Sequence, residues 1–138
     1  MTKYNTNLAA EFYVLSMLHR LGADAALTLG NKKAVDIIVA NEDGTLTTID
    51  VKGLAGTYDW PADNVHLEDP RHFYVLVSFE GKIKDPQSVP SAWIIPSTEI
   101  KPFLHSFKTR RDVLRSVVKR EGKQFLHAWH LITREKDT

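Results

Sequence analysis

The stretch from Ala34 to Gly53, AVDIIVANEDGTLTTIDVKG, places charged side chains inside an apolar, β-branched segment. Val, Ile and Thr favour strands, whereas Asp is depleted from them. Burying a charge is costly unless the charge is paired, hydrogen-bonded or bound to a metal. The segment therefore predicts two strands, over residues 34–40 and 45–52, in which Asp36, Asp50 and Lys52 need partners.

The letters NEDG between these strands predict a hairpin turn. A three-residue loop that ends at Gly44 would use the glycine in a left-handed conformation. That loop places Asp36 opposite Asp50, with facing Cβ atoms roughly 4.5–5.5 Å apart. Lys52 lies two residues beyond Asp50 and projects from the same face. A two-residue turn at Asp43 and Gly44 would instead shift the register and move one acid away.

Two facing carboxylates repel each other, and one normally takes up a proton unless a cation lies between them. Carboxylate oxygens suit Mg²⁺ and Mn²⁺, which polarise a phosphoryl oxygen and make a bound water more acidic. A neighbouring ammonium group offsets the charge that develops on a phosphorane. The hairpin therefore indicates metal-assisted phosphodiester hydrolysis. The alternative is a structural ion pair of Lys52 with Asp36 or Asp50.

A helix is predicted over residues 7–21, capped by Asn5 or Thr6 and ending at Gly22. Its apolar stripe has helical spacing and also contains the acid Glu11. The stripe consists of Leu8, Phe12, Leu15 and Leu18.

The other elements follow from apolar runs and turn residues. Strands are expected at 24–29, 72–79 and 91–96, a loop at 53–71, helices at 97–107 and 109–120, and a short helix at 123–129. This order predicts a mixed α/β sandwich, and the length of 138 residues predicts a single domain over 1–138.

Composition excludes several classes of protein. Apolar residues make up 43% of the chain and charged residues 25%, which is typical of a soluble globular protein. No apolar run is long enough to span a bilayer, and the first residues do not form a signal peptide. The chain has no cysteine, so it has neither a disulfide framework nor a thiolate zinc site. We expect a cytoplasmic protein without a membrane partner.

Basic residues concentrate in the last quarter of the chain. Residues 1–100 hold 8 Lys and Arg against 13 Asp and Glu, whereas residues 101–138 hold 10 against 4. On the helix predicted at 109–120, basic side chains would form one stripe that contacts DNA phosphates without reading sequence. A solvated helix face is the alternative. The stripe consists of Lys108, Arg111, Arg115 and Lys119.

Further candidates lie in the turn and loop around the hairpin. Lys32 and Lys33 precede the Asp36 strand and would contact a phosphate, although an ordinary turn explains them equally well. Tyr58 and Trp60, in the loop after Lys52, would either stack on a splayed base or fill a surface hollow.

The combined motifs resemble those of the PD-(D/E)XK nuclease superfamily. VD at 35–36 is followed after thirteen residues by DVK at 50–52. EFYVLSMLHRLG, which begins at Glu11, resembles the first helix of the Holliday-junction-resolvase-like members, which carry an early glutamate. The resemblance covers roughly residues 7–53. The chain has Val35 in place of the namesake proline, and a predicted loop where the family has a helix after the lysine-bearing strand.

The resemblance implies a restriction-endonuclease-like fold, a mixed β-sheet flanked by helices, with a Mg²⁺- or Mn²⁺-dependent endonuclease site that cleaves DNA. Asp36, Asp50 and the carbonyl of Val51 would bind the metal. Lys52 would position the attacking water, and Glu11 would reach the metal directly or through water.

Two other functions remain open at this point: a catalytically inactive nuclease-like module that binds DNA, and an interaction domain with a structural ion pair. Cleavage of both DNA strands with one site per chain would favour a homodimer.

Overall fold

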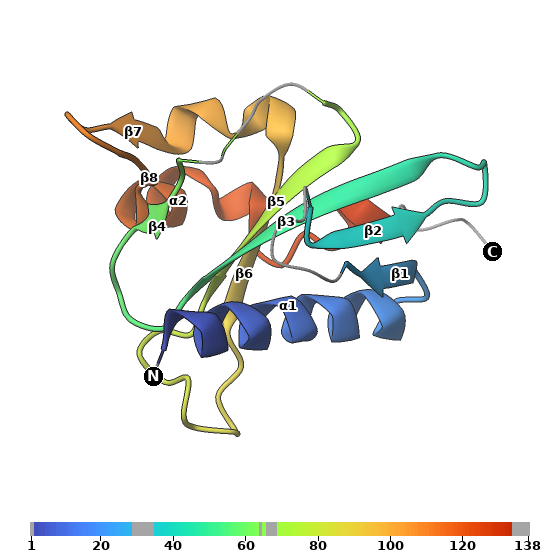
Figure 1. Ribbon diagram of the computed structural model, residues 1–138, viewed down its shortest axis with the longest axis horizontal. Coiled ribbons are helices and arrows are strands. Elements are labelled where there is room, and N and C mark those ends of the chain that lie inside the picture. Colours follow the sequence, from blue (N-terminus) through green and yellow to red (C-terminus); the bar gives the residue numbers. More distant parts are fainter. Residues whose placement is uncertain (1, 29–34, 64, 66–68, 134–138) are drawn as a thin grey trace.

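The computed structural model of the chain describes residues 2–28, 35–63, 65 and 69–133 (Figure 1). Its longer elements are α1 (Lys3–Arg20), β1 (Asp24–Leu27), β2 (Ile37–Ala40), β3 (Leu46–Leu54), β5 (His72–Ser78), β6 (Ser91–Pro96) and α2 (Arg115–Glu121). Its shorter elements are β4 (Trp60–Pro61), η1 (Ser97–Glu99), η2 (Lys101–Phe103), β7 (Leu104–Ser106), β8 (Arg111–Val113), η3 (Lys123–Phe125) and α3 (His130–Thr133). Within the described residues, no helix is both long and apolar enough to cross a membrane.

The larger sheet has the strand order β1-β2-β3-β5-β6 and is mixed. β3 and β5 are parallel, whereas the other neighbouring strands are antiparallel. A smaller sheet has the order β4-β8-β7. The predicted α/β class with a mixed sheet and flanking helices is therefore confirmed, and the predicted loop 53–71 also contains β4.

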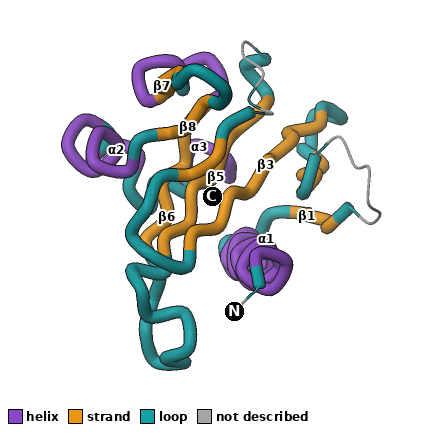
Figure 2. The backbone as a smooth tube through the Cα atoms, turned by 60° about the vertical axis from the view of Figure 1, so that its left-hand side comes forward, coloured by secondary structure: helices purple, strands orange, loops and turns teal. Residues whose placement is uncertain are grey.

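Hydrophobic side chains cover both faces of the larger sheet. Ile49, Val51 and Val75 pack into a cluster with α1. Tyr74 and Leu76, which alternate with these positions, pack into a second cluster with β4, β8 and α2. Figure 2 shows α1 on one side of the β3–β5 pair, and α2 with β8 on the other. Because β5 is covered on both faces, it reads in the sequence as a continuous apolar run.

Helix α1 begins earlier than predicted and ends where predicted. Its N-cap is Thr2, whose Oγ1 accepts a hydrogen bond from the Asn5 N–H at 3.1 Å, and not Asn5 or Thr6 themselves. The helix ends before Gly22, which has φ +85°. This left-handed residue lets the chain turn into β1.

The buried face of α1 differs from the predicted apolar stripe. Of the predicted stripe, Leu18 is completely buried and Leu15 packs against the core cluster, but Phe12 is 55% exposed. Ala10 and Val14, which lie outside that stripe, are completely buried, so the face toward the sheet is rotated from the predicted one. Glu11 is nevertheless buried, as predicted, with 6% of its surface exposed.

The β2–β3 hairpin has the predicted register. Ile37 pairs with Ile49 and Ala40 with Leu46, and Gly44 has φ +84°. The three-residue loop that ends at the glycine is therefore confirmed.

The two helices predicted after β6 are wrong in large part. Residues 97–107 form two 3-10 turns and then β7, and the first half of the 109–120 segment forms β8. Val113 pairs with both Trp60 and Leu104, and it is fully buried in the second cluster. Helix α2 begins only after Leu114, where Asp59 Oδ1 accepts a hydrogen bond from the Arg115 N–H at 2.9 Å. These pairings join distant parts of the chain, so a local pattern does not reveal them.

Gly53 sets the distance between α1 and β3. A Cβ atom at this position would lie 2.8 Å from the Ala10 Cβ and 3.0 Å from the Thr6 carbonyl oxygen. Such contacts require the helix to move away from the strand. The glycine after Lys52 therefore allows the helix that carries Glu11 to approach the sheet closely.

Gly53→Ala is expected to lower the free energy of unfolding by about 1–3 kcal/mol, because it overpacks this contact. Ala10→Gly relieves part of the clash, so the double variant should lose less stability than the two single variants together. Urea unfolding of the four proteins in a double-mutant cycle measures this coupling. Strictly additive losses would contradict the proposed contact.

Candidate functional site

Asp36 binds the edge of β3 at the point where β2 ends. The ladder between β2 and β3 stops at Ile37, and the chain bends at Asp36. The Asp36 N–H donates to the Ile49 carbonyl at 3.0 Å, and the Asp36 Oδ2 accepts from the Val51 N–H at 2.8 Å. The Asp36 carboxylate thus takes the place of a backbone carbonyl of β2. It accepts the hydrogen bond from the Val51 N–H, which the β2 backbone does not reach.

The Val51 carbonyl is directed toward the same edge of β3. In a strand, the N–H and the C=O of one residue point toward the same neighbouring strand. Because the Val51 N–H meets Asp36, its carbonyl also points to the side that β2 has left. A carboxylate and a carbonyl oxygen, both suitable ligands for Mg²⁺, therefore lie at this edge.

Asp50 directly precedes Val51 in β3, and its hydrogen-bond donor is a different residue from that of Asp36. Its Oδ2 is 3.3 Å from the Nε2 of His72, the first residue of β5. Asp50 pairs with Tyr74 and Lys52 with Leu76, so both charged side chains lie on the sheet face of the second cluster. The β2–β3 ladder stops at the Ile37–Ile49 pair, so Asp36 and Asp50 do not form its next pair, and each acid has its own hydrogen-bond donor.

Lys52 lies in the electric field of these acids without forming an ion pair. Its side chain is half-buried, and among the described residues its ammonium group has neither a hydrogen bond nor a salt bridge. Burial lowers the pKa of Lys52, and the nearby charges of Asp50, Asp36 and Asp63 partly oppose this shift. Among the described residues, Lys52 therefore does not form the structural ion pair with Asp36 or Asp50 that was considered as an alternative.

Glu11 lies on the α1 face that packs against the sheet. Glu11 is only 6% exposed, and its sequence neighbour Ala10 packs into the cluster that also contains Val51. Within the described residues, no group of three or more His, Asp or Glu side chains is arranged to hold a metal ion.

The basic stripe predicted on one helix does not exist, because its residues fall on a turn, a strand and a helix. Arg111 donates to the Val65 carbonyl at 2.8 Å. Arg115 forms a salt bridge with Glu80, and Lys119 approaches the same carboxylate at 3.4 Å. Burial raises the pKa of Glu80, but the hydrogen bonds and charges of Arg115 and Lys119 lower it further, so the net shift is downward.

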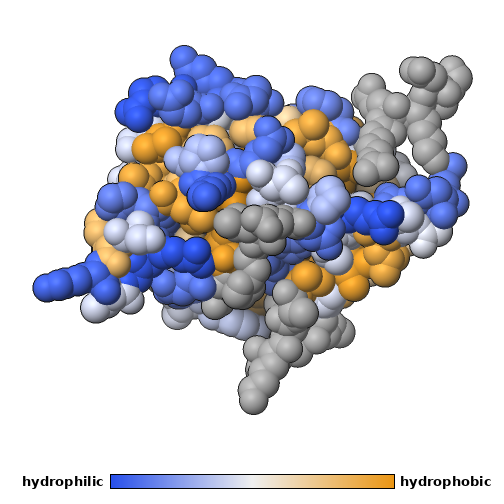
Figure 3. All heavy atoms as spheres, turned by 90° about the horizontal axis from the view of Figure 1, so that it is seen from above, coloured by the Kyte–Doolittle hydropathy of each residue, from blue (hydrophilic) through white to orange (hydrophobic). Residues whose placement is uncertain are grey.

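The remaining predicted DNA contacts, Lys32 and Lys33, lie outside the described residues. The β7–β8 turn, at the left in Figure 1, is exposed and contains Lys108 and Arg110 beside Phe107, which is 43% exposed. On the face of the molecule seen in Figure 3, hydrophilic side chains lie mainly at the margins and hydrophobic side chains lie between them. Lys108 lies in this turn, away from the helical stripe in which it was expected.

The loop after β3 holds one structural aromatic residue and one exposed one. Trp60 is fully buried, donates from Nε1 to the Val77 carbonyl at 3.2 Å, and contacts Trp93 edge to face. It therefore fills the core and is not available for stacking on a base. Tyr58 is 77% exposed.

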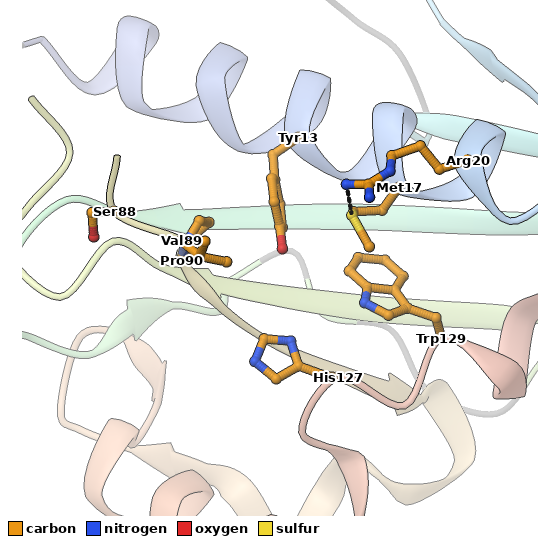
Figure 4. A pocket seen from close by; sticks show the side chains of 8 residues that line it. All are labelled: Tyr13, Met17, Arg20, Ser88, Val89, Pro90, His127 and Trp129. Atoms are coloured by element: carbon orange, nitrogen blue, oxygen red, sulfur yellow. Dashed lines mark hydrogen bonds between the residues drawn. The ribbon is translucent and has the colours of Figure 1, made fainter. Parts of the chain in front are cut away.

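A pocket of about 450 Å³ lies on the α1 side of the molecule and contains none of the predicted site residues (Figure 4). It lies between α1, the loop before β6 and the segment before α3. Tyr13 points into it from α1, and His127 and Trp129 close its opposite side. This pocket and the Asp36–Asp50 region are therefore separate features.

Three residues near Lys52 were not singled out from the sequence. Lys3 and Asp63 both act electrostatically on its ammonium group, and His72 contacts Asp50. His72 had a detectable signal, because it begins the most apolar strand of the chain. Lys3 and Asp63 had none, since only the tertiary fold brings them to β3.

Lys52→Met is expected to raise the free energy of unfolding of the metal-free chain at neutral pH. Burial lowers the pKa of Lys52 below its ordinary value of 10.5, so between these two pKa values the unfolded chain binds more protons than the folded chain. The free energy of unfolding of the wild type therefore rises as the pH rises between these two pKa values. The stability difference between Lys52→Met and the wild type becomes smaller over the same range. Urea unfolding in EDTA from pH 7 to 10 measures it, with exposed Lys123→Met as the control. A loss of stability at pH 7 would contradict the pKa shift.

Arg115→Met is expected to lower the free energy of unfolding by about 1–3 kcal/mol, because it leaves a partly buried carboxylate without its closest partner. Lys119→Met should cost less than about 1 kcal/mol, since that ammonium group is more exposed. The side chains of Arg115 and Lys119 are 15% and 44% exposed. Thermal and urea unfolding compare the two variants. Equal stability of both, together with weaker DNA binding by Arg115→Met, would show that Arg115 serves the DNA interface.

Comparisons with known proteins support the fold. No protein-family model matches the sequence, and no curated protein matches it. A solved structure of a bacterial homing endonuclease, I-Ssp6803I, is similar over 100% of both chains, with a TM-score of 0.56 and 15% sequence identity. At this level of identity the likeness concerns the fold alone. The chain therefore has a mixed α/β fold like that of a solved endonuclease.

Proposed function

We propose that the chain is a metal-dependent nuclease that hydrolyses DNA phosphodiester bonds. The observation that carries this proposal is the environment of Lys52, a half-buried ammonium group in the field of Asp36 and Asp50 that forms no ion pair with any described residue. A half-buried ammonium group of this kind lowers the stability of a fold, because unpaired buried charge is destabilising. Such groups are therefore more typical of functional sites than of purely structural positions. The likeness to a solved homing endonuclease over the whole chain supports the same activity. The fold alone would not be sufficient, because one fold hosts many functions.

The oxygen donors at the edge of β3 fit Mg²⁺ or Mn²⁺. Asp36 and Asp50 would supply one carboxylate each and Val51 its carbonyl, and water would complete the coordination. The bound ion supplies Lewis acidity toward a phosphoryl oxygen and makes a bound water more acidic. The two acids flank Val51 in the fold, since Asp36 binds its N–H and Asp50 precedes it in the strand.

Lys52 would position the attacking water and offset negative charge on the phosphorane. No carboxylate of the described residues holds its Nζ, so within this part of the chain it can donate to a phosphate oxygen or to water without first breaking a salt bridge. Its lowered pKa also makes proton exchange at Nζ easier near neutral pH than for an exposed lysine. Glu11 would contribute from α1, directly or through water, because it is the buried acid of that helix.

Binding of DNA without cleavage is the competing function, and one observation favours it. Within the described residues, the acids do not form a three-ligand cluster. An inactive module would keep the fold and the affinity for DNA but show no metal-dependent turnover. We propose Lys32 and Lys33 as phosphate contacts in either case, because they immediately precede the Asp36 segment.

Asp50→Asn and Lys52→Ala are both expected to reduce DNA cleavage at least about 100-fold, as loss of one preorganised charged group typically does. They should differ in metal binding. Asp50→Asn should weaken Mn²⁺ binding because a ligand charge is lost, whereas Lys52→Ala should leave it largely intact. Cleavage of plasmid, single-stranded and branched DNA with Mg²⁺ or Mn²⁺ measures the first effect, and calorimetric titration measures the second.

The matched controls are Asp85→Asn and Lys123→Ala, which remove an exposed acid and an exposed lysine elsewhere. Both should cleave like the wild type. Equal cleavage by wild type and Asp50→Asn would reject the proposed site. DNA binding without cleavage under every metal would establish the inactive module instead.

A further inference from the structure

His72 lies beside the proposed metal ligand Asp50 and has contacts on three sides. Its Nε2 is 3.3 Å from Asp50 Oδ2, and its Nδ1 is 2.7 Å from Thr48 Oγ1. The ring of Tyr74 packs edge to face against the imidazole, with ring centroids 4.9 Å apart and an interplanar angle of 85°. The side chain of His72 is only 12% exposed.

The parallel pairing of β3 and β5 creates this arrangement. Thr48 pairs directly with His72, so the histidine lies over the β3 residues Thr48 and Asp50, which share a sheet face. The ring is therefore held by the sheet itself and not by a loop. A contact of this kind joins positions that are 22 and 24 residues apart in the sequence.

The two hydrogen bonds select one tautomer of the neutral ring. A carboxylate only accepts hydrogen bonds, so Nε2 must carry the proton that faces Asp50. Nδ1 is then an acceptor, and it receives the proton of the Thr48 hydroxyl group. The hydrogen bond from Thr48 thus keeps the proton of the neutral ring on Nε2. This N–H then donates to Asp50 Oδ2 and holds that oxygen in place.

The second carboxylate oxygen, Oδ1 of Asp50, has no hydrogen-bond partner among the described residues. The Asp50 side chain is 23% exposed, and Oδ2 is the oxygen that the histidine anchors. Anchoring one oxygen restricts rotation of the carboxylate before a metal arrives. Partners of this kind orient metal ligands and strengthen metal binding.

We propose that His72 is a positioning residue that orients the Asp50 carboxylate for metal binding, with Thr48 holding the histidine in the required tautomer. This inference rests on the proposed nuclease function. His72 acts through Asp50, so it is expected to change the affinity for the metal more than the rate at saturating metal.

The test is calorimetric titration of Mn²⁺ into the EDTA-treated full chain without DNA. His72→Ala should bind Mn²⁺ about 10–100-fold more weakly than the wild type, as loss of such partners typically does. His72→Gln, whose amide can donate to Asp50, should recover a large part of the affinity. His130→Ala, which removes an exposed histidine at the start of α3, is the matched control and should bind like the wild type.

Two further measurements separate positioning from a merely structural role. Cleavage by His72→Ala should fall at limiting Mn²⁺ and recover as Mn²⁺ is raised. Long-range ¹H–¹⁵N spectra of the wild type at neutral pH should show His72 protonated at Nε2, and Thr48→Val should abolish this preference. If His72→Ala fails to fold, Thr48→Val carries the test, because it removes the hydroxyl group that holds the histidine tautomer. It should bind Mn²⁺ more weakly than the wild type, and wild-type affinity in Thr48→Val would overturn the inference.

The possible failures are distinguishable. Wild-type Mn²⁺ affinity in His72→Ala would overturn the positioning role and leave the nuclease proposal in place. Protonation of His72 at Nδ1 would overturn the hydrogen-bond order on which the role depends. Absence of Mn²⁺ binding by the wild type itself would overturn both proposals.

Discussion

The early end of β2 is the constraint on which the candidate site depends. If β2 continued to pair past Ile37, its backbone would satisfy the Val51 N–H and cover the Val51 carbonyl. Because the chain bends instead, Asp36 satisfies the donor with its side chain at 2.8 Å, and a negative charge comes to the edge of β3. A backbone requirement of the sheet thereby places a carboxylate where a cation can reach it.

The side chains of β3 alternate between the two faces of the sheet, and this alternation separates packing residues from charged ones. Ile49 and Val51 pack under α1 and hold the strand in the sheet. Asp50 and Lys52 point to the other face, where they are only half-buried at the margin of the second cluster. This partial burial keeps both side chains in contact with solvent and lowers the pKa of Lys52. The site is therefore rigid in its backbone and accessible in its side chains.

The sequence predicts the local part of this arrangement and misses the long-range part. The hairpin register follows from the two-residue period of the strands and from the left-handed conformation at Gly44, both of which are local. The partners of the charges do not follow from it, because His72 and Asp63 reach β3 only through tertiary pairing. The prediction of a basic stripe on one helix was wrong for the same reason. The hydrogen bond from the Arg115 N–H to Asp59, a residue distant in sequence, marks the start of α2 at Arg115.

The central claim is that Asp36, Asp50 and the Val51 carbonyl bind a divalent cation. A crystal soaked in Mn²⁺ tests it most directly, with data collected at a wavelength where manganese scatters anomalously. We expect a peak at the edge of β3, within about 2.5 Å of a carboxylate oxygen from each acid and of the carbonyl. A map in which Mn²⁺ occupies other sites but leaves this edge without a peak would contradict it.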